Sequence, residues 1–370
     1  MPSLRHLHAA VIALVLSVGV GVALTSHQAA AQEPTGLVTH HTAHHTAHDT
    51  ARCTTPAPMT AAGYQAMFDA KDDPSWAGGD QAASVALPDG RELWLFGDTV
   101  RGDRLVHNSL LVQDRGCLTA VPAADEVIPT RADGQWYWPQ SAVVVGKQLL
   151  VFCGRVERTG AGAFDFRTTG TEIAVFDLAG RTPRFARMVA TPSIDAGEDQ
   201  AHYGASTVLD GTTLYVYGSR HSVGAFGRQV TVAKVPARDV AHASAWRYWT
   251  GATWAARSTA ARPVADRWST AFSTWRSADG RLRSLTKEDD VYGRSVVAGT
   301  ATSPTSGFSR RVVLDAPSSQ DFLHYNALAH PEVRMADGLL LVTVCQNSTD
   351  LTRVLADHSL YKPQFRTIRG

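Results

Sequence analysis

Hydrophobic residues along this chain occur in short runs that are separated by glycine-containing turns. In residues 78–99, GGDQAASVALPDGRELWLFGDT, an apolar run over 82–87 meets the turn PDGR at 88–91, and a second apolar run follows over 93–96. Two apolar runs joined by an Asp-Gly turn are typical of a β-hairpin. We therefore predict two antiparallel strands here.

An aspartate lies at each free end of this predicted hairpin. Folding the chain about the turn places Leu87 opposite Glu92 and Gln81 opposite Asp98, so Asp80 and Asp98 reach the same end of adjacent strands. Neighbouring strands lie about 4.8 Å apart, and strict alternation would point the two side chains to opposite faces. The glycines that precede each aspartate predict a local bend that changes this.

The same pattern recurs through the rest of the chain. The turn glycines are separated by 56 to 69 residues, and they are Gly90, Gly146, Gly211, Gly280 and Gly338. Each unit has room for four short strands, and long helical periodicity is scarce. Repeats of this kind predict an all-β fold, a five-bladed β-propeller, in which the C-terminal SLYKPQFRTI supplies a late strand. A chain of two β-sandwiches is the alternative, since Asp-Gly hairpins are common in β-rich proteins.

The first 31 residues have the pattern of a secretory signal peptide. Arg5 opens a basic region, residues 9–24 are apolar, and small residues at 29–31 offer a cleavage site near Ala31. No later apolar stretch reaches the roughly 20 residues of a membrane span. We therefore expect a secreted protein.

Two further regions follow the predicted signal peptide. Residues 32–63 are predicted to be a His/Thr-rich disordered linker, and residues 64–370 form the propeller domain. The linker contains THHTAHHTAHDTAR, for which a metal-binding tract is the alternative interpretation. Across the 370 residues the formal net charge is only +1, with acidic and basic residues interspersed. This excludes the usual patterns of nucleic-acid and membrane binding, and we expect a monomer with a neutral or weakly charged ligand.

In a propeller, the first strand of each blade lines the central channel, so the segments before the five hairpins meet at one mouth. These segments and the ends of the second strands carry aromatic and polar side chains. The candidate substrate-binding residues are Trp138, Gln140, Tyr203, Arg220, Trp268, Lys287, Tyr325 and Asn347. Aromatic rings cover the apolar faces of sugars and polar groups bind the hydroxyls, so we predict a polysaccharide or oligosaccharide ligand.

Asp80 and Asp98 are the candidate catalytic residues. Two carboxyl groups across a sugar are the usual apparatus of glycoside hydrolysis, in which one is protonated and the other ionised. The sequence leaves their individual roles, and retention or inversion, open. Glu288 and Glu332 are further acid candidates, and His330 with Glu332 could form a site pair. The structural alternative is that the aspartates only cap strand ends.

No cofactor is expected, and the known nucleophile, zincin and P-loop motifs are absent from the sequence. Acidic clusters offer an alternative, a structural Ca²⁺ ion. They are Asp195, Glu198, Asp199 and residues 288–290.

The four cysteines test the predicted architecture. Cys53 precedes the first blade and Cys117 ends it, so we predict a disulfide between them. Cys153 and Cys345 belong to the second and fifth blades, which are not neighbours, so we expect both to be buried thiols.

Together, GGDQAASVALPDGRELWLFGDT, YVYGSR, YNALAHPE and LYKPQF resemble a group of secreted actinobacterial five-bladed propeller proteins, a domain-of-unknown-function family related to endo-D-arabinanase glycoside hydrolases. The resemblance covers roughly residues 64–368. It implies that Asp80 and Asp98 are catalytic and that the substrate is an arabinan-like, furanose-containing polysaccharide. Two other functions stay open, a lectin-like propeller that binds sugar without cleaving it and a propeller for protein contacts at the cell envelope.

Overall fold

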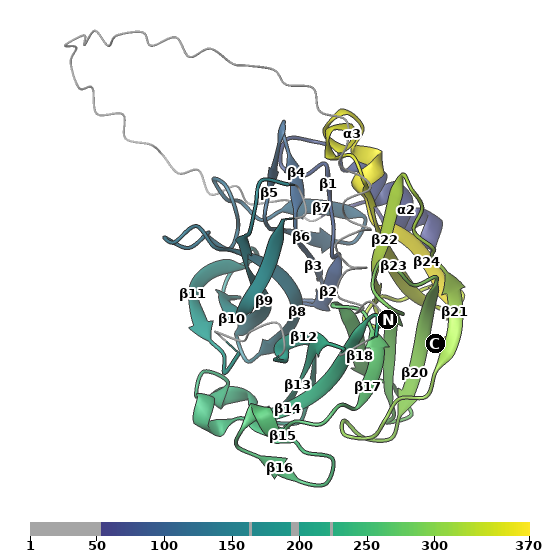
Figure 1. Ribbon diagram of the computed structural model, residues 1–370. Coiled ribbons are helices and arrows are strands. Elements are labelled where there is room, and N and C mark those ends of the chain that lie inside the picture. Colours follow the sequence, from purple (N-terminus) through teal and green to yellow (C-terminus); the bar gives the residue numbers. More distant parts are fainter. Residues whose placement is uncertain (1–52, 163–164, 194–199, 223–224) are drawn as a thin grey trace, which may run out of the picture. The chain divides into compact units, whose positions relative to one another are not determined.

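The computed structural model describes residues 53–162, 165–193, 200–222 and 225–370 (Figure 1). The predicted signal peptide, its cleavage site and residues 32–52 of the predicted linker lie outside this part. The described chain is all-β, as predicted, with only short helices.

Strands follow one another as antiparallel meanders in five larger sheets. The first sheet holds β2 (Ala83–Ala86), β3 (Glu92–Phe96), β6 (Ser109–Asp114) and β7 (Cys117–Ala120). The second holds β8 (Trp136–Val145), β9 (Gln148–Arg158), β10 (Phe166–Asp177) and β11 (Arg184–Ala190). The third holds β12 (His202–Asp210), β13 (Thr213–His221), β14 (Arg228–Pro236), β15 (Arg247–Trp249) and β16 (Trp254–Ala255), and β17 (Ala265–Trp268) pairs with β14.

The remaining elements complete the chain. The fourth sheet holds β18 (Phe272–Arg276), β19 (Leu282–Lys287), β20 (Ser295–Ala301) and β21 (Arg311–Asp315), and the fifth holds β22 (Phe322–Ala329), β23 (Leu340–Ser348) and β24 (Gln364–Ile368). A small sheet joins β1 (Gly78–Gly79), β4 (Thr99–Arg101) and β5 (Arg104–Val106). The helices are α2 (Ala61–Ala70) and α3 (Leu351–Ala356), with 3-10 turns η1 (Ala237–Asp239), η2 (Ala243–Ala245), η3 (Ser258–Ala260) and η4 (His358–Tyr361).

The five predicted hairpins are confirmed. Each of the five larger sheets begins with a pair of strands that meets at one of the predicted turn glycines. All of these glycines have a positive φ, with values of 84° at Gly90, 61° at Gly146, 59° at Gly211, 76° at Gly280 and 69° at Gly338. A residue with a side chain is strained in this region, which explains why glycine marks every turn.

The register predicted for the first hairpin is wrong by one residue. Leu87 N donates to Arg91 O at 2.7 Å, and Ala86 lies opposite Glu92. The loop therefore contains three residues, 88–90, with the glycine in the left-handed position, and this is a common hairpin geometry. The change moves every pairing in the hairpin by one position.

Hydrogen bonds connect the first strand of each sheet, or the residues just before it, to the next sheet and finally the fifth sheet to the first. They are Gln81 Nε2 to Gln140 O (3.0 Å), Ser141 Oγ to Gly204 O (2.7 Å), Ser206 Oγ with Thr274 Oγ1 (2.8 Å), Ala329 N to Ser273 Oγ (2.9 Å) and Asn326 Nδ2 to Gln81 Oε1 (2.9 Å). All five of these strands also line one cavity of about 190 Å³.

Helix α2 closes the contact between the first and fifth sheets. The Thr60 side chain caps the helix by accepting from Gly63 N at 3.0 Å. On the buried face, Phe68 lies between Trp94 of β3 and Phe365 of β24, with ring centroids 5.1 and 4.9 Å away. Figure 1 shows this purple helix beside the yellow strand β24. The predicted linker therefore extends too far, because residues 61–63 already belong to the folded domain.

The predicted disulfide is confirmed. Cys53 and Cys117 are bonded, with Cα atoms 6.0 Å apart, and Cys153 and Cys345 are buried free thiols. No helix in the described part of the chain is long and apolar enough to cross a membrane.

Candidate functional site

The small sheet brings Asp80 and Asp98 together. Asp80 N donates to Asp98 O at 3.2 Å, and Gly97 N donates to Asp80 O at 3.1 Å. Gln81 and Ala82 then turn the chain through the left-handed region, with φ values of 72° and 52°, before β2 begins. The bend predicted from the neighbouring glycines is thus present, and it leaves the two aspartates side by side.

Gly97 allows the close approach of Asp80. A Cβ atom on Gly97 would lie only 2.5 Å from Asp80 Oδ1 and 3.6 Å from Trp138 Cδ1. A larger residue would have to displace the carboxyl group. This explains why glycine precedes Asp98 in the motif.

The Asp98 carboxyl is arranged as a hydrogen-bond acceptor. Trp138 Nε1 donates to Asp98 Oδ1 at 2.7 Å, and His107 Nδ1 lies 3.1 Å from the same oxygen. The His107 ring stacks on Trp136 at 4.3 Å, and Phe166 packs edge-on to Trp138 at 4.7 Å. The Asp98 side chain is 31% exposed, so one side of it is open to solvent.

Asp80 lies in different surroundings. Tyr325 donates its hydroxyl proton to Asp80 Oδ2 at 2.8 Å, and Tyr361 forms a second side-chain hydrogen bond with it. Burial raises the pKa of Asp80 to about 7; the negative charge of Asp98 adds to this, and the hydroxyls oppose it. Near neutral pH, therefore, Asp80 can hold a proton beside an Asp98 that accepts N–H donors.

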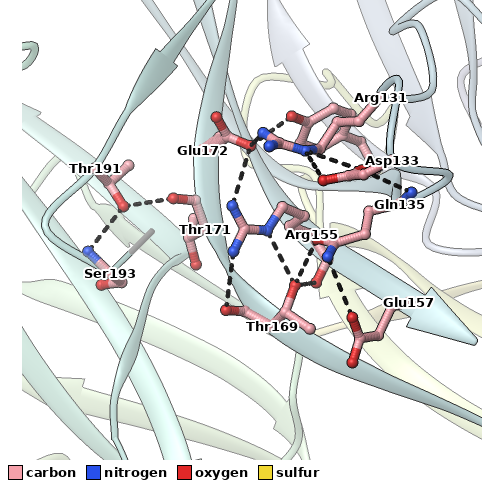
Figure 2. A network of polar contacts seen from close by, with 11 residues as sticks. Arg131, Asp133, Gln135, Arg155, Glu157, Thr169, Thr171, Glu172, Thr191 and Ser193 are labelled. Atoms are coloured by element: carbon pink, nitrogen blue, oxygen red, sulfur yellow. Dashed lines mark hydrogen bonds and ion pairs between the residues drawn. The ribbon is translucent and has the colours of Figure 1, made fainter. Parts of the chain in front are cut away.

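A polar network in the second sheet supports the strand that carries Trp138 (Figure 2). The buried carboxylate of Glu172 on β10 accepts from the Tyr137 hydroxyl and from Arg131 Nη1 at 3.2 Å, while Arg155 lies 3.9 Å away. Burial, together with Glu172, raises the pKa of the Tyr137 hydroxyl. On β8 the network bonds the Tyr137 hydroxyl, next to the Trp138 indole that meets Asp98.

Three other predicted binding residues lie on the second, fifth and third sheets. Gln140 bulges from β8 and lines the cavity, and its buried Oε1 has no partner among the described residues. Asn347 on β23 is nearly buried, and its Oδ1 likewise lacks a partner in the described chain. Arg220 at the end of β13 donates to Gln229 Oε1 at 3.1 Å.

Two predicted aromatic residues do not reach the site. Tyr203 is fully buried, and its ring packs on Tyr248 with centroids 5.1 Å apart. Trp268 is 4% exposed and packs on Phe272. Tyr203 precedes a register shift of two residues, Gly204 and Ala205, in its strand. Neither residue is kept as a substrate contact.

Lys287 is also a structural residue. It is fully buried and donates to the backbone carbonyls of Asp290 and Gly293. Burial lowers the pKa of its ammonium group to about 8, which the nearby aspartates oppose. It anchors a loop and does not face solvent.

The cavity along the first strands holds a separate polar cluster. Ser84 Oγ contacts His330 Nδ1 at 2.5 Å and donates to Glu332, while His330 Nε2 lies 2.9 Å from Thr343 Oγ1. Ser84 and Glu332 line the cavity, whereas Asp80 and Asp98 are not among its lining residues. The pair and this cavity cluster are therefore separate groups, and Gln81, which follows Asp80, bonds to Gln140 O and Asn326 Nδ2.

Sequence reasoning missed His107, Trp136 and Tyr361 as neighbours of the pair. Tyr361 belongs to LYKPQF, a stretch with a resemblance but no assigned role. His107 lies opposite Asp98 at the end of the β4–β5 hairpin, in which Thr99 pairs with Val106. Trp136 of the second sheet stacks on the His107 ring, so it joins the site through packing between sheets.

Most of the chain matches one known protein family. The family model described as "Domain of unknown function (DUF5005)" matches residues 62–370. The chain belongs to this DUF5005 family. None of the curated proteins matches it.

Solved structures share the fold of this DUF5005 chain. A candidate hydrolase from Bacteroides ovatus is 18% identical, with 83% of this chain and 89% of that chain covered and a TM-score of 0.65. A GH43_1 enzyme from Xanthomonas citri, solved with xylotriose, is 15% identical, with 83% and 93% covered and a TM-score of 0.50. The likeness shows that the DUF5005 chain has the all-β fold of glycoside hydrolase family 43 propellers.

Most acidic side chains in the described part of the DUF5005 chain are dispersed or paired with basic groups. Within the described ranges, no group of three or more His, Cys, Asp or Glu side chains is placed to hold a metal ion. Asp195, Glu198 and Asp199 lie outside those ranges. Glu288 and Asp289 are instead paired with Arg267, and Asp290 accepts from Thr270 N at 2.7 Å.

Proposed function

We propose that this chain is a secreted, monomeric glycoside hydrolase that cleaves an arabinan-like, furanose-containing polysaccharide, with Asp80 and Asp98 as its catalytic carboxyl groups. One observation carries the proposal. The two aspartates lie side by side, one enclosed beside tyrosine hydroxyls and the other partly open and bonded by N–H donors. Such unequal surroundings separate the protonated from the ionised partner.

We further propose that the fold is a five-bladed propeller. Its family would consist of secreted actinobacterial proteins that are related to the endo-D-arabinanases. Five successive hairpin-led sheets support this count, and so do the hydrogen bonds that pass from sheet to sheet and return from the fifth to the first. The cysteine bridge supports secretion, since disulfides persist mainly in extracellular compartments.

The geometry assigns a role to each carboxyl. Asp80 is the general acid, which gives its proton to the glycosidic oxygen as the bond from that oxygen to the anomeric carbon breaks. Asp98 is the ionised partner that supplies the nucleophile, itself or by activating water. Water finally adds its oxygen to the anomeric carbon. One of its protons stays on the new hydroxyl, and the other replaces the proton that Asp80 gave to the leaving group.

Trp138 is the proposed sugar platform, because its indole touches Asp98 and joins Phe166 in an aromatic wall. Four polar candidates complete the proposed binding set: Gln140, Arg220, Tyr325 and Asn347. The solved xylotriose complex of the X. citri neighbour supports a saccharide ligand for this fold.

The test is incubation of the protein with arabinan, arabinogalactan and xylan, with analysis of released oligosaccharides. We expect products from arabinan with the wild type and none with Asp98→Asn. Asp315→Asn, a change of an exposed aspartate on β21, is the matched control and should behave as wild type. Equal products from wild type and Asp98→Asn would refute catalysis by Asp98. The anomer of the first product, read by NMR, distinguishes direct attack by Asp98 from attack by water.

A carbohydrate-binding propeller without catalysis is the second candidate. It is favoured by the fact that both aspartates already accept hydrogen bonds from the protein, as purely structural aspartates do. In that case the same polymers would bind to wild type and Asp98→Asn alike, and neither would release products.

A further inference from the structure

The segments that connect the second strand to the third strand of the five sheets all lie at the same end of the sheets as Asp98. In every sheet the second strand runs back from the hairpin turn, so the segment that leads to the third strand returns to the end where the first strand began. The described residues of these connections are 97–108, 159–162 with 165, 222 with 225–227, 288–294 and 349–363. Asp98 lies on the first of them and Tyr361 on the last.

Exposed aromatic side chains lie on these connections or directly after them. In the described chain, the large aromatic residues with the highest exposure are Phe166 (37%), Phe226 (59%) and Tyr292 (66%). Phe166 belongs to the wall beside Asp98. Phe226 and Tyr292 lie on the third and fourth connections, away from the first sheet, and their ring centroids are 5.4 Å apart.

Several hydrogen bonds fix the backbone around Tyr292, at residues 287–293. Lys287 donates to Asp290 O and Gly293 O, and Tyr292 N donates to Asp289 O at 3.1 Å. Arg267 binds the Asp289 carboxylate from β17. A flexible loop would not need a buried lysine to fix its carbonyls, so these contacts favour a preorganised position for the Tyr292 ring.

The two connections also contact each other. A Cβ atom on Gly227 would lie 2.9 Å from Arg267 Cα and 2.9 Å from Asp289 Oδ1. The backbone next to Phe226 therefore packs directly on Arg267 and Asp289, which belong to the contacts that fix the Tyr292 segment. Phe226 and Tyr292 therefore form one aromatic platform, and the charged groups below it are already paired with one another.

We propose that Phe226 and Tyr292 form a second saccharide subsite, which binds the same polysaccharide chain at a distance from the Asp80–Asp98 pair. The inference rests on the proposed function for its ligand. Two adjacent, largely exposed rings suit the apolar face of a sugar. A pair of rings is small for a protein interface, which buries roughly 800 Å² per partner. The two rings lie at the same end of the sheets as the aspartates, so a single polysaccharide chain could occupy both sites.

The experiment uses the full chain as Phe226→Ala, Tyr292→Ala and the double variant. Leu209→Ala is the matched control, since Leu209 is 37% exposed at the hairpin-turn end of β12. Binding of soluble arabinan and arabinogalactan is measured by affinity electrophoresis in an Asp98→Asn background. Hydrolysis is compared on arabinan and on short arabinose oligomers, without that background change.

We expect the double variant to bind the polymer about tenfold more weakly and to raise KM on the polymer similarly, because anchor side chains typically carry about 1.4 kcal/mol or more. Rates on the shortest cleaved oligomer stay as in the wild type, and Tyr292→Phe keeps polymer binding. Wild-type polymer binding by the double variant overturns the subsite, as does a wild type that binds none of these polymers. If the wild type binds but cleaves nothing, and the double variant loses binding, the subsite stands while the hydrolase proposal fails.

Discussion

The seam between the first and fifth sheets holds two groups of buried acids, and they differ in what surrounds them. At one end, Asp80 lies against a second carboxyl group, and its neighbour Asp98 opens to solvent. In the cavity, Glu332 is bonded by Ser84, which also contacts His330, and burial raises the Glu332 pKa and lowers that of His330 to about 3. In the first group the Asp98 side chain is open to solvent beside an aromatic wall, whereas Glu332 lines the cavity and accepts from Ser84.

This contrast teaches that a shifted pKa does not by itself mark a catalytic group. Both acids have raised pKa values because burial disfavours the charged form. The distinguishing features are the aromatic wall beside Asp98 and the exposure of its side chain to solvent. The substitutions below test whether the Asp80–Asp98 group affects catalysis and whether the cavity cluster affects stability.

The largest effect is expected from Asp80→Asn. Loss of the general acid should lower kcat on arabinan about 1000-fold, which corresponds to about 4 kcal/mol of transition-state free energy. The free energy of unfolding at pH 8 should not fall, since the amide carries no charge to desolvate. Initial rates and urea denaturation measure the two. Wild-type rates with Asp80→Asn would move the chemistry away from this pair.

The cavity cluster should show the reverse behaviour. His330→Ala removes a fully buried ring that touches Trp94, Ser84 and Thr343, and we expect a loss of about 3 kcal/mol in unfolding free energy. The activity per folded molecule should stay near that of the wild type. A variant that is stable but inactive would place this cluster in the catalytic apparatus.

Stability should also depend on pH through Glu92. Burial, with the charge of Glu332, raises the Glu92 pKa to about 7. A raised carboxyl pKa stabilises the fold fully below its ordinary value near 4.5, and this contribution is lost as pH rises through 7. Glu92→Gln should therefore flatten the fall in unfolding free energy between pH 5 and 8 by about 2 kcal/mol. Thermal unfolding across this range measures it, and identical slopes in variant and wild type would contradict the assignment.

The smallest effect is expected from Tyr325→Phe. The tyrosine hydroxyl bonds to Asp80 and lowers its pKa, so its removal should raise that pKa further. The basic limb of the kcat/KM profile should then move to higher pH, with a change in maximal rate within about tenfold. An unchanged profile would show that Asp80 does not set this limb.

Much of the fold was predictable because its signals are local. A glycine with positive φ is required at each tight turn, and so the five hairpins could be located from residues such as Gly90 and Gly211. The Cys53–Cys117 bridge followed from the order of the units. The nearness of Asp80 to Asp98 followed from one hairpin, even though its register was wrong by one residue.

By itself, the sequence determined the all-β repeat, the bridge and the paired aspartates, because each depends on neighbours along one hairpin or one unit. The tertiary structure decided which side chains surround the pair. Trp138 and Tyr361 come from distant segments, and Tyr203, which precedes a two-residue register shift in β12, lies in the core. Such contacts join residues that are far apart in the sequence, so no local pattern records them. Only packing between sheets shows which face meets the site.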